Sequence, residues 1–179
     1  MSKYIAMLRG INVSGQKLIK MADLRESMTQ LGLEDVATYV QSGNILFHAK
    51  ETDLKLLAQK IEGQIKKDFT FDVPCIVRTA DYFKKVLTNN DFLQQGKEEK
   101  RCYVTFLEEE PDLIHIQKIE PQQYAPEEYI IKGDLLYFYS PDGYGKAKMN
   151  NNFFEQKLRV KATTRNWNSV NKLYELATQ

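Results

Sequence analysis

The chain has 179 residues and a formal net charge of +1, with 42% hydrophobic and 27% charged residues. These fractions are typical of a folded globular protein and exclude wholesale disorder. No apolar run approaches the roughly 20 residues that a membrane-spanning helix needs. Arg9 and Asn12 end the short apolar run of the N-terminus too early for a signal peptide, so we expect a cytoplasmic protein without a membrane partner.

The hydrophobic pattern of residues 1–96 predicts the order strand, helix, strand, strand, helix, strand. The strands are Lys3–Leu8, Val36–Val40, Ile45–Phe47 and Val73–Val77, and the helices are Met21–Leu31 and Asp53–Phe69. A short helix at Asp81–Leu87 follows. This order is that of a ferredoxin-like βαββαβ unit.

A second pass of similar order follows the linker-like segment around Gly96. It comprises strand Arg101–Leu107, helix Pro111–Ile119, hairpin strands Tyr129–Lys132 and Leu135–Tyr139, helix Asn152–Leu158, strand Val160–Ala162 and a final helix Asn166–Ala177. We predict an α+β fold of two ferredoxin-like subdomains, residues 1–96 and residues 97–179, plus the C-terminal helix. The two passes share no visible residue identity, so internal duplication is a hypothesis.

The charged residues are distributed unevenly along the chain. Residues 91–142 carry five Lys and Arg against twelve Asp and Glu, whereas residues 143–179 carry seven against two and residues 1–33 carry five against two. If the two basic ends come together, they form a positive face. The alternative is that these charges are scattered over several solvated faces.

The cysteines and histidines do not form a cluster. Cys75 and Cys102 each lie in an apolar stretch, where a thiol is usually a small core residue rather than half of a disulfide. His48 and His115 are not near them or each other in sequence. Because no group has metal-ligand spacing, we predict no metal site and no cofactor.

A polar loop with two glycines, Gly10 and Gly15, follows the first strand. A junction of strand, glycine-containing loop and helix can hold an anion on its backbone N–H groups. The candidate contacts are Arg9, Asn12, Lys17 and Lys20. The loop resembles a P-loop, but the lysine spacing differs and Leu18 replaces the Ser or Thr that would bind Mg²⁺. We therefore exclude P-loop nucleotide hydrolysis and retain anion binding.

Two further polar segments are candidates for ligand contact. Residues 41–44 form either a plain turn between two strands or a source of donors and acceptors, with Gln41, Ser42 and Asn44 as candidates. Residues 141–148 form either a solvated loop or a mobile flap over a phosphate, with Lys146 and Lys148 as candidates.

The segment before the final helix contains Trp167, the single tryptophan of the chain. We expect Thr163 or Thr164 to cap this helix and Trp167 to anchor it in the core. Capping does not require the remaining polar residues, so these are candidate ligand contacts: Arg165, Asn166 and Asn168. We expect this segment to form one wall of a site that also includes the two polar segments near residues 9–12 and 41–44.

Five ordered motifs run along the chain: Leu8–Val13, Lys20–Leu24, Tyr39–Asn44, Pro141–Gly143 and Thr163–Asn168. Together they resemble the bacterial family called domain of unknown function 1697. The resemblance implies an α+β chain of two similar subdomains related to the ferredoxin-like arrangement, and it carries no established activity. Ala147 replaces the serine that this family usually has in the basic loop.

Our leading hypothesis is that the protein binds a phosphate-bearing ligand, either a nucleotide or a short single-stranded nucleic acid, at a basic, Asn- and Gln-rich cleft. The alternative is an enzyme acting on a small anionic metabolite, with Asp23 or Tyr144 as the acid–base group, although no motif selects a catalytic residue. In a third hypothesis the motifs only fasten the subdomains together. The oligomeric state is open, with a monomer favoured.

Overall fold

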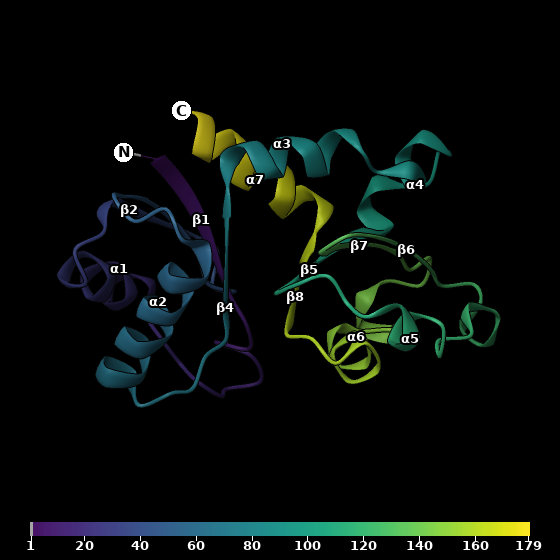
Figure 1. Cartoon of the computed structure of the whole chain (residues 1–179), viewed down its shortest axis with the longest axis horizontal. Helices are drawn as coiled ribbons and strands as arrows, with labels where there is room; N and C mark the ends of the chain where they lie inside the picture. Colours follow the sequence, from purple (N-terminus) through teal and green to yellow (C-terminus); the bar gives the residue numbers. More distant parts are fainter. Residues whose placement is uncertain (1) are drawn as a thin grey trace. The chain divides into compact units, whose positions relative to one another are not determined.

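A computed structural model describes the backbone of residues 2–179 and the side chains of residues 3–179 (Figure 1). The chain divides into two compact units. The first unit consists of Met1–Lys84 and Leu173–Gln179, and the second unit consists of Lys85–Lys172. Helices α3 (Ala80–Thr88) and α7 (Trp167–Thr178) each continue through a point of division. The sequence indicated a boundary between two subdomains near residue 96. That boundary stays a prediction.

The first unit contains a four-stranded antiparallel sheet and two helices. Its elements are β1 (Ser2–Leu8), α1 (Met21–Gln30), β2 (Glu34–Tyr39), β3 (Asn44–Ala49), α2 (Leu54–Phe69) and β4 (Cys75–Thr79). The strands lie in the order β2-β3-β1-β4. The predicted order of strands and helices is therefore confirmed for this part of the chain.

The core of the first unit joins one face of the sheet to one stripe of each helix. Alternate residues of β1 and β3 belong to the same buried cluster as the helix residues that the sequence pattern predicts. These residues are Tyr4, Ala6, Leu8, Ile45 and Phe47 from the strands, and Leu24, Met28, Leu57, Ile61 and Ile65 from the helices. Asp53 caps α2, because its Oδ1 accepts hydrogen bonds from the backbone N–H groups of Lys55 (2.9 Å) and Leu56 (3.0 Å).

The second unit contains another four-stranded antiparallel sheet. Its elements after α3 are α4 (Asp91–Gln94), η1 (Glu99–Arg101), β5 (Cys102–Leu107), α5 (Leu113–Ile116), η2 (Pro121–Tyr124), β6 (Glu128–Lys132), β7 (Leu135–Tyr139), η3 (Tyr144–Lys146), α6 (Asn151–Leu158) and β8 (Ala162–Asn166), where η denotes a 3-10 helix. The strands lie in the order β6-β7-β5-β8. The fold is therefore a mixed α+β fold with two antiparallel sheets.

The core of the second unit is rich in aromatic rings. Phe138 of β7 packs edge to face against Phe154 of α6, with ring centroids 5.7 Å apart. Tyr129 of β6 contacts the same Phe154 ring at 5.6 Å. These contacts hold α6 against the sheet.

One predicted helix of the second unit is much shorter than expected. The sequence predicts a helix at Pro111–Ile119, whereas α5 spans only Leu113–Ile116. Leu113 and Ile114 are 65% and 60% exposed, so the segment has no continuous buried stripe. A short helix without such a stripe is marginal in water, which accounts for its length.

The predicted cap of the C-terminal helix is also wrong. Thr163 and Thr164 lie in β8, which pairs with β5, and neither precedes the helix directly. Threonine is β-branched and favours strands, and here pairing with β5 prevails over capping. The cap is Asn166, whose Oδ1 accepts a hydrogen bond from the Ser169 N–H at 2.8 Å.

The structure also bears on membrane spans and on the thiols. Within residues 2–179, no helix is long and apolar enough to cross a bilayer. Cys75 and Cys102 are both buried, which confirms that they are core residues.

Candidate functional site

The side chain of Asn12 joins two separate loops of the first unit. Its Nδ2 donates to the carbonyl oxygens of Ile19 (3.0 Å) and Gln41 (2.9 Å), and its Oδ1 accepts from the Ile19 N–H (2.8 Å). Asn12 has a φ of 54°, a left-handed conformation that asparagine tolerates better than most residues. These bonds close the loop at residues 12–19 and hold the turn at residues 40–43 beside it. We call residues 9–20 together with residues 40–42 the loop surface.

The turn is packed tightly against the start of the loop. At Gly43, which has a φ of 82°, an added Cβ would lie 2.7 Å from Ile11 Cδ1 and 2.9 Å from Leu8 Cβ. The buried Asn44 side chain donates to the carbonyl oxygen of Tyr39 (3.0 Å) and to Ser42 Oγ (3.2 Å). The buried Asn44 side chain therefore holds the turn in position through these bonds, whereas the side chains of residues 41 and 42 are exposed.

Three cationic residues belong to the loop surface. Arg9 is half-buried, and Lys20 is exposed. Lys20 also precedes α1 without a side-chain cap hydrogen bond. The Nζ of Lys17 donates to the carbonyl oxygen of Asp72 at 2.5 Å. Positive charge thus lies in the same loop whose closure Asn12 fixes.

Three apolar side chains of the loop surface are exposed, which the sequence did not predict. Val13, Leu18 and Val40 are 57%, 66% and 45% exposed. Val40 also has a φ of 54°, where a β-branched residue is strained by about 1–2 kcal/mol. Val13 and Leu18 lie in a polar segment and on no periodic stripe, which is the available signal, whereas Val40 was assigned to the end of the predicted strand Val36–Val40 and lies just after β2. The loop surface is therefore amphipathic.

The candidate lysines of the second unit lie in a fixed loop. The carboxylate of Glu127 accepts hydrogen bonds from the backbone N–H groups of Lys148 and Met149, both at 2.8 Å. The Tyr144 hydroxyl accepts from the first backbone N–H of α6 at 2.8 Å. These bonds favour an anchored loop over a mobile flap, and they leave the Lys146 and Lys148 side chains exposed.

The candidates around β8 differ in exposure. Arg165 is only 7% exposed, and its Nη1 donates to Thr163 Oγ1 (2.8 Å) and to the Thr164 carbonyl oxygen (3.0 Å). Asn166 is exposed and caps α7, and Asn168 is exposed in the first turn of that helix. Arg165 is thus bonded along its own strand. A single cleft built from both sets of candidates stays a prediction.

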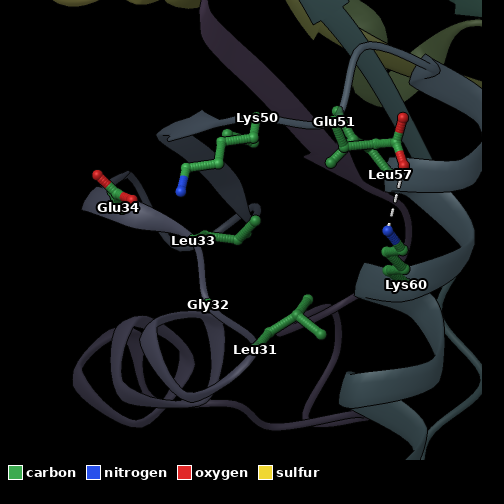
Figure 2. A pocket seen from close by; sticks show the side chains of 9 residues that line it. Leu31, Gly32, Leu33, Glu34, Lys50, Glu51, Leu57 and Lys60 are labelled. Carbon is green, nitrogen blue, oxygen red and sulfur yellow. Dashed lines mark hydrogen bonds and ion pairs between the residues drawn. The ribbon is translucent and has the colours of Figure 1, made fainter. Parts of the chain in front are cut away.

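A cavity of about 230 Å³ lies in the first unit, away from all the candidates that the sequence indicated (Figure 2). The connection between α1 and β2, the connection between β3 and α2, and α2 itself form its walls. Its lining combines leucines with charged side chains: Leu31, Leu33, Leu57, Glu34, Lys50, Glu51 and Lys60. No motif or periodicity signals this cavity, because its residues come from three elements separated in sequence.

The charged side chains around this cavity are arranged in two ways. Glu51 Oε2 and Lys60 Nζ are paired at 3.2 Å. The Glu51 carboxylate also accepts hydrogen bonds from the backbone N–H groups of Asp53 and Thr52. These bonds lower the pKa of Glu51, and the bond from Asp53 has the largest effect. Lys50 instead extends from the end of β3 towards Leu33 and Glu34 (Figure 2).

A second cavity of about 320 Å³ in the first unit brings a histidine near a carboxylate. His48 Nδ1 lies 3.1 Å from Asp35 Oδ2, but among the described residues it makes no aligned hydrogen bond. The Asp35 side chain is 81% exposed. An acid–base pair needs an aligned bond and restricted access to water, so this geometry does not assign a catalytic dyad. Among residues 2–179, no group of His, Cys, Asp or Glu side chains could hold a metal ion.

Comparisons with known proteins bear on the fold and the family. The conserved bacterial protein SP0830 from Streptococcus pneumoniae is similar over 100% of this chain and 99% of its own, with a TM-score of 0.77 and 24% identity, so the likeness shows a shared fold. No curated protein matches the chain. The family model described as protein of unknown function (DUF1697) matches residues 1–137. That match covers most of the chain and includes the motifs Leu8–Val13, Lys20–Leu24 and Tyr39–Asn44, and the chain belongs to the DUF1697 family.

Proposed function

We propose that the protein binds a phosphate-bearing ligand, a nucleotide or a short single-stranded nucleic acid, at the loop surface of the first unit. The observation that carries this proposal is the Asn12 side chain, which hydrogen-bonds to residues of both loops. Through these bonds the polar turn lies next to the loop that carries the cations. Phosphate groups are bound by such combinations of cationic side chains and neutral donors.

The candidate residues divide into two roles. Asn12 and Asn44 use their side-chain amides within the fold, so we assign them to positioning. The residues that contact the ligand are Arg9, Lys17, Lys20, Gln41 and Ser42. In the second unit, the exposed side chains of Lys146, Lys148, Asn166 and Asn168 are further candidate contacts, and Arg165 positions β8.

Fluorescence anisotropy with labelled single-stranded DNA and RNA tests the nucleic-acid form of the proposal. Three phosphate contacts on a single strand predict a slope of about −2 in log K against log salt, because each contact releases about 0.7 counterion. Lys20→Met should reduce that slope by about 0.7. Lys118→Met, an exposed lysine of the second unit, is the matched control and should leave it unchanged. Absence of binding at low salt, or equal effects of the two variants, would exclude this form.

Thermal unfolding with mononucleotides and with inorganic phosphate tests the small-ligand form. A ligand present at 100 times its Kd stabilises the folded state by about 2.7 kcal/mol, which raises the melting temperature measurably. The rise should be smaller for Lys20→Met than for Lys118→Met. If no nucleotide raises the melting temperature and no oligonucleotide binds in the anisotropy experiment, the proposal of phosphate recognition is excluded.

The hydrogen bonds of Asn12 and Asn44 also favour a second candidate, in which the motifs are structural only. In that case Asn12→Ala destabilises the protein while Lys20→Met and Gln41→Ala change neither stability nor binding. The discriminating measurement is the pair of exposed variants, because neither side chain makes a hydrogen bond to a described residue.

We further propose that both units are ferredoxin-like subdomains that arose by duplication. The supporting observation is that each unit has the order strand, helix, strand, strand, helix, strand, and that the strand orders β2-β3-β1-β4 and β6-β7-β5-β8 correspond. Superposition of the six equivalent elements tests this origin. Strands that align while the helices cross the sheets differently would argue for convergence instead.

A further inference from the structure

We propose that the cavity shown in Figure 2 binds a small zwitterionic ligand with an aliphatic side chain, which is the chemistry of a free aliphatic α-amino acid. The cavity uses residues 31–34, 49–51, 57 and 60, none of which belongs to the loop surface. The proposal is therefore independent of phosphate binding, and either can fail without the other.

The charges around the cavity favour a zwitterion over an anion. Its lining contains two ammonium groups and two carboxylates, and Glu51 and Lys60 are paired with each other at 3.2 Å. Lys50 and Glu34 are both exposed, and neither side chain forms an ion pair or a hydrogen bond with a described residue. A ligand carboxylate can pair with Lys50 while its ammonium pairs with Glu34. A purely anionic ligand such as phosphate would be repelled by Glu34.

The lower part of the cavity suits an aliphatic group. Leu33 and Leu57 are 7% and 2% exposed and belong to the main core cluster of the unit, and Leu31 packs against that cluster. Figure 2 shows Leu31 and Leu33 below Lys50, and Leu57 on the other side of the view beside Glu51. Each CH₂ group that a ligand buries fully against these leucines should raise its affinity by at most about fourfold.

The volume of the cavity limits the ligand to a small metabolite. About 230 Å³ corresponds to roughly eight water molecules at about 30 Å³ each, so the ligand has on the order of eight to ten non-hydrogen atoms. Leucine has this size, whereas a nucleotide is far too large. An amino acid with an aliphatic side chain fits both the size and the charges of the cavity.

Titration of the isotope-labelled protein with L-leucine, followed by amide chemical shifts, tests the proposal. Leucine should shift the amide signals of residues 32–34 and 50–51. Two half-ligands separate the charges: 4-methylpentanoate lacks the ammonium, and 3-methylbutylamine lacks the carboxylate. Each should bind about two- to fivefold more weakly, because an exposed ion pair contributes only about 0.5–1 kcal/mol. Alanine, which retains both charges but lacks the chain, should also bind more weakly.

Matched variants assign the charges. Lys50→Met and Glu34→Gln should each weaken leucine binding about two- to fivefold, because each removes one partner of the zwitterion at an exposed position. Lys55→Met on α2 and Glu109→Gln in the second unit remove the same charges from exposed positions outside the cavity. These controls should bind leucine as the parent does. All four substitutions are at exposed positions, and circular dichroism spectra verify the fold.

Several results would overturn the proposal. Leucine that shifts no amide signal in the millimolar range, or shifts signals only elsewhere, would exclude the site. Equal binding of 4-methylpentanoate and leucine would refute the role of Glu34. Inorganic phosphate that competes with leucine would contradict the charge argument. Unchanged leucine affinity in Lys50→Met and Glu34→Gln would also contradict the charge argument.

Discussion

Asn12 Nδ2 lies 2.9 Å from the carbonyl oxygen of Gln41, and this bond connects loops 29 residues apart in the chain. Asn12→Ala removes it along with the two bonds to Ile19, so we expect a loss of about 2–3 kcal/mol in the free energy of unfolding. Urea unfolding followed by circular dichroism measures the shift in midpoint. Asn168→Ala, at an exposed helix position, should stay within about 0.5 kcal/mol of the parent. Equal midpoints for both variants would show that the Asn12 bonds contribute nothing.

Substitution of Gly43 should be more damaging than substitution of a second glycine in the same region. Gly43→Ala places a Cβ 2.7 Å from Ile11 Cδ1 at a φ of 82°, so conformational strain and overpacking together should cost about 3 kcal/mol. Gly15 has a φ of 75° but no atom within 4 Å of an added Cβ, so Gly15→Ala should cost only about 1 kcal/mol. Urea midpoints compare the two. A larger effect at Gly15 would mean that the turn does not pack against the loop as described.

Replacement of Val40 should stabilise the protein. Val40→Asn relieves the strain of a β-branched residue at a φ of 54°, and we expect a gain of about 0.5–1 kcal/mol. Val13 is also exposed but does not have a positive φ, so Val13→Asn should give no gain. Melting temperatures of the two variants provide the measurement. If both rise together, removal of exposed apolar surface rather than backbone strain is the cause.

Cys102 should react slowly with thiol reagents. Burial disfavours the thiolate and raises the pKa of Cys102 to about 11. At pH 8 only about one molecule in a thousand then carries the thiolate, against about a quarter for a free thiol of pKa about 8.5. Peptide mass spectrometry after brief alkylation should find Cys102 unmodified in the folded protein and modified in urea. Rapid modification without urea would contradict this burial.

The same pKa shift makes stability depend on alkaline pH. The thiol is protonated in both states below the unfolded pKa, so the contribution of Cys102 is complete there. As the pH rises towards 11, the unfolded thiol ionises first and stability falls. Urea midpoints of the parent and of Cys102→Ala should therefore converge between about pH 9 and pH 11. A constant difference across that range would exclude titration of this thiol as the cause.

The sequence predicted most of the fold because the periodicity of its apolar residues is strong. Leu57, Ile61 and Ile65 lie at four-residue spacing, and all three are buried on α2. The prediction failed at Thr163 and Thr164, where a local capping preference competed with strand pairing to β5. Pairing partners distant in sequence cannot be read from a local pattern.

The candidate sites also differ in how much of each could be predicted from the sequence. Asn12 and Gln41 could be singled out because polar residues with glycines mark functional loops. The bond between them could not be predicted, since it joins two turns with unusual backbone angles. The cavity beneath Lys50 was missed entirely, because each of its residues is ordinary in its own segment and only the fold brings them together.

The first unit is formed by both ends of the chain: Lys3 Nζ donates to the carbonyl oxygen of Leu176 at 2.9 Å, across 173 residues. During synthesis these last residues leave the ribosome only after the entire second unit has been made. The second unit is a continuous segment and can fold as it emerges, whereas the first unit begins earlier and is completed later. A premature stop before residue 173 therefore removes part of the first unit, although every residue of β1 to β4 is still present.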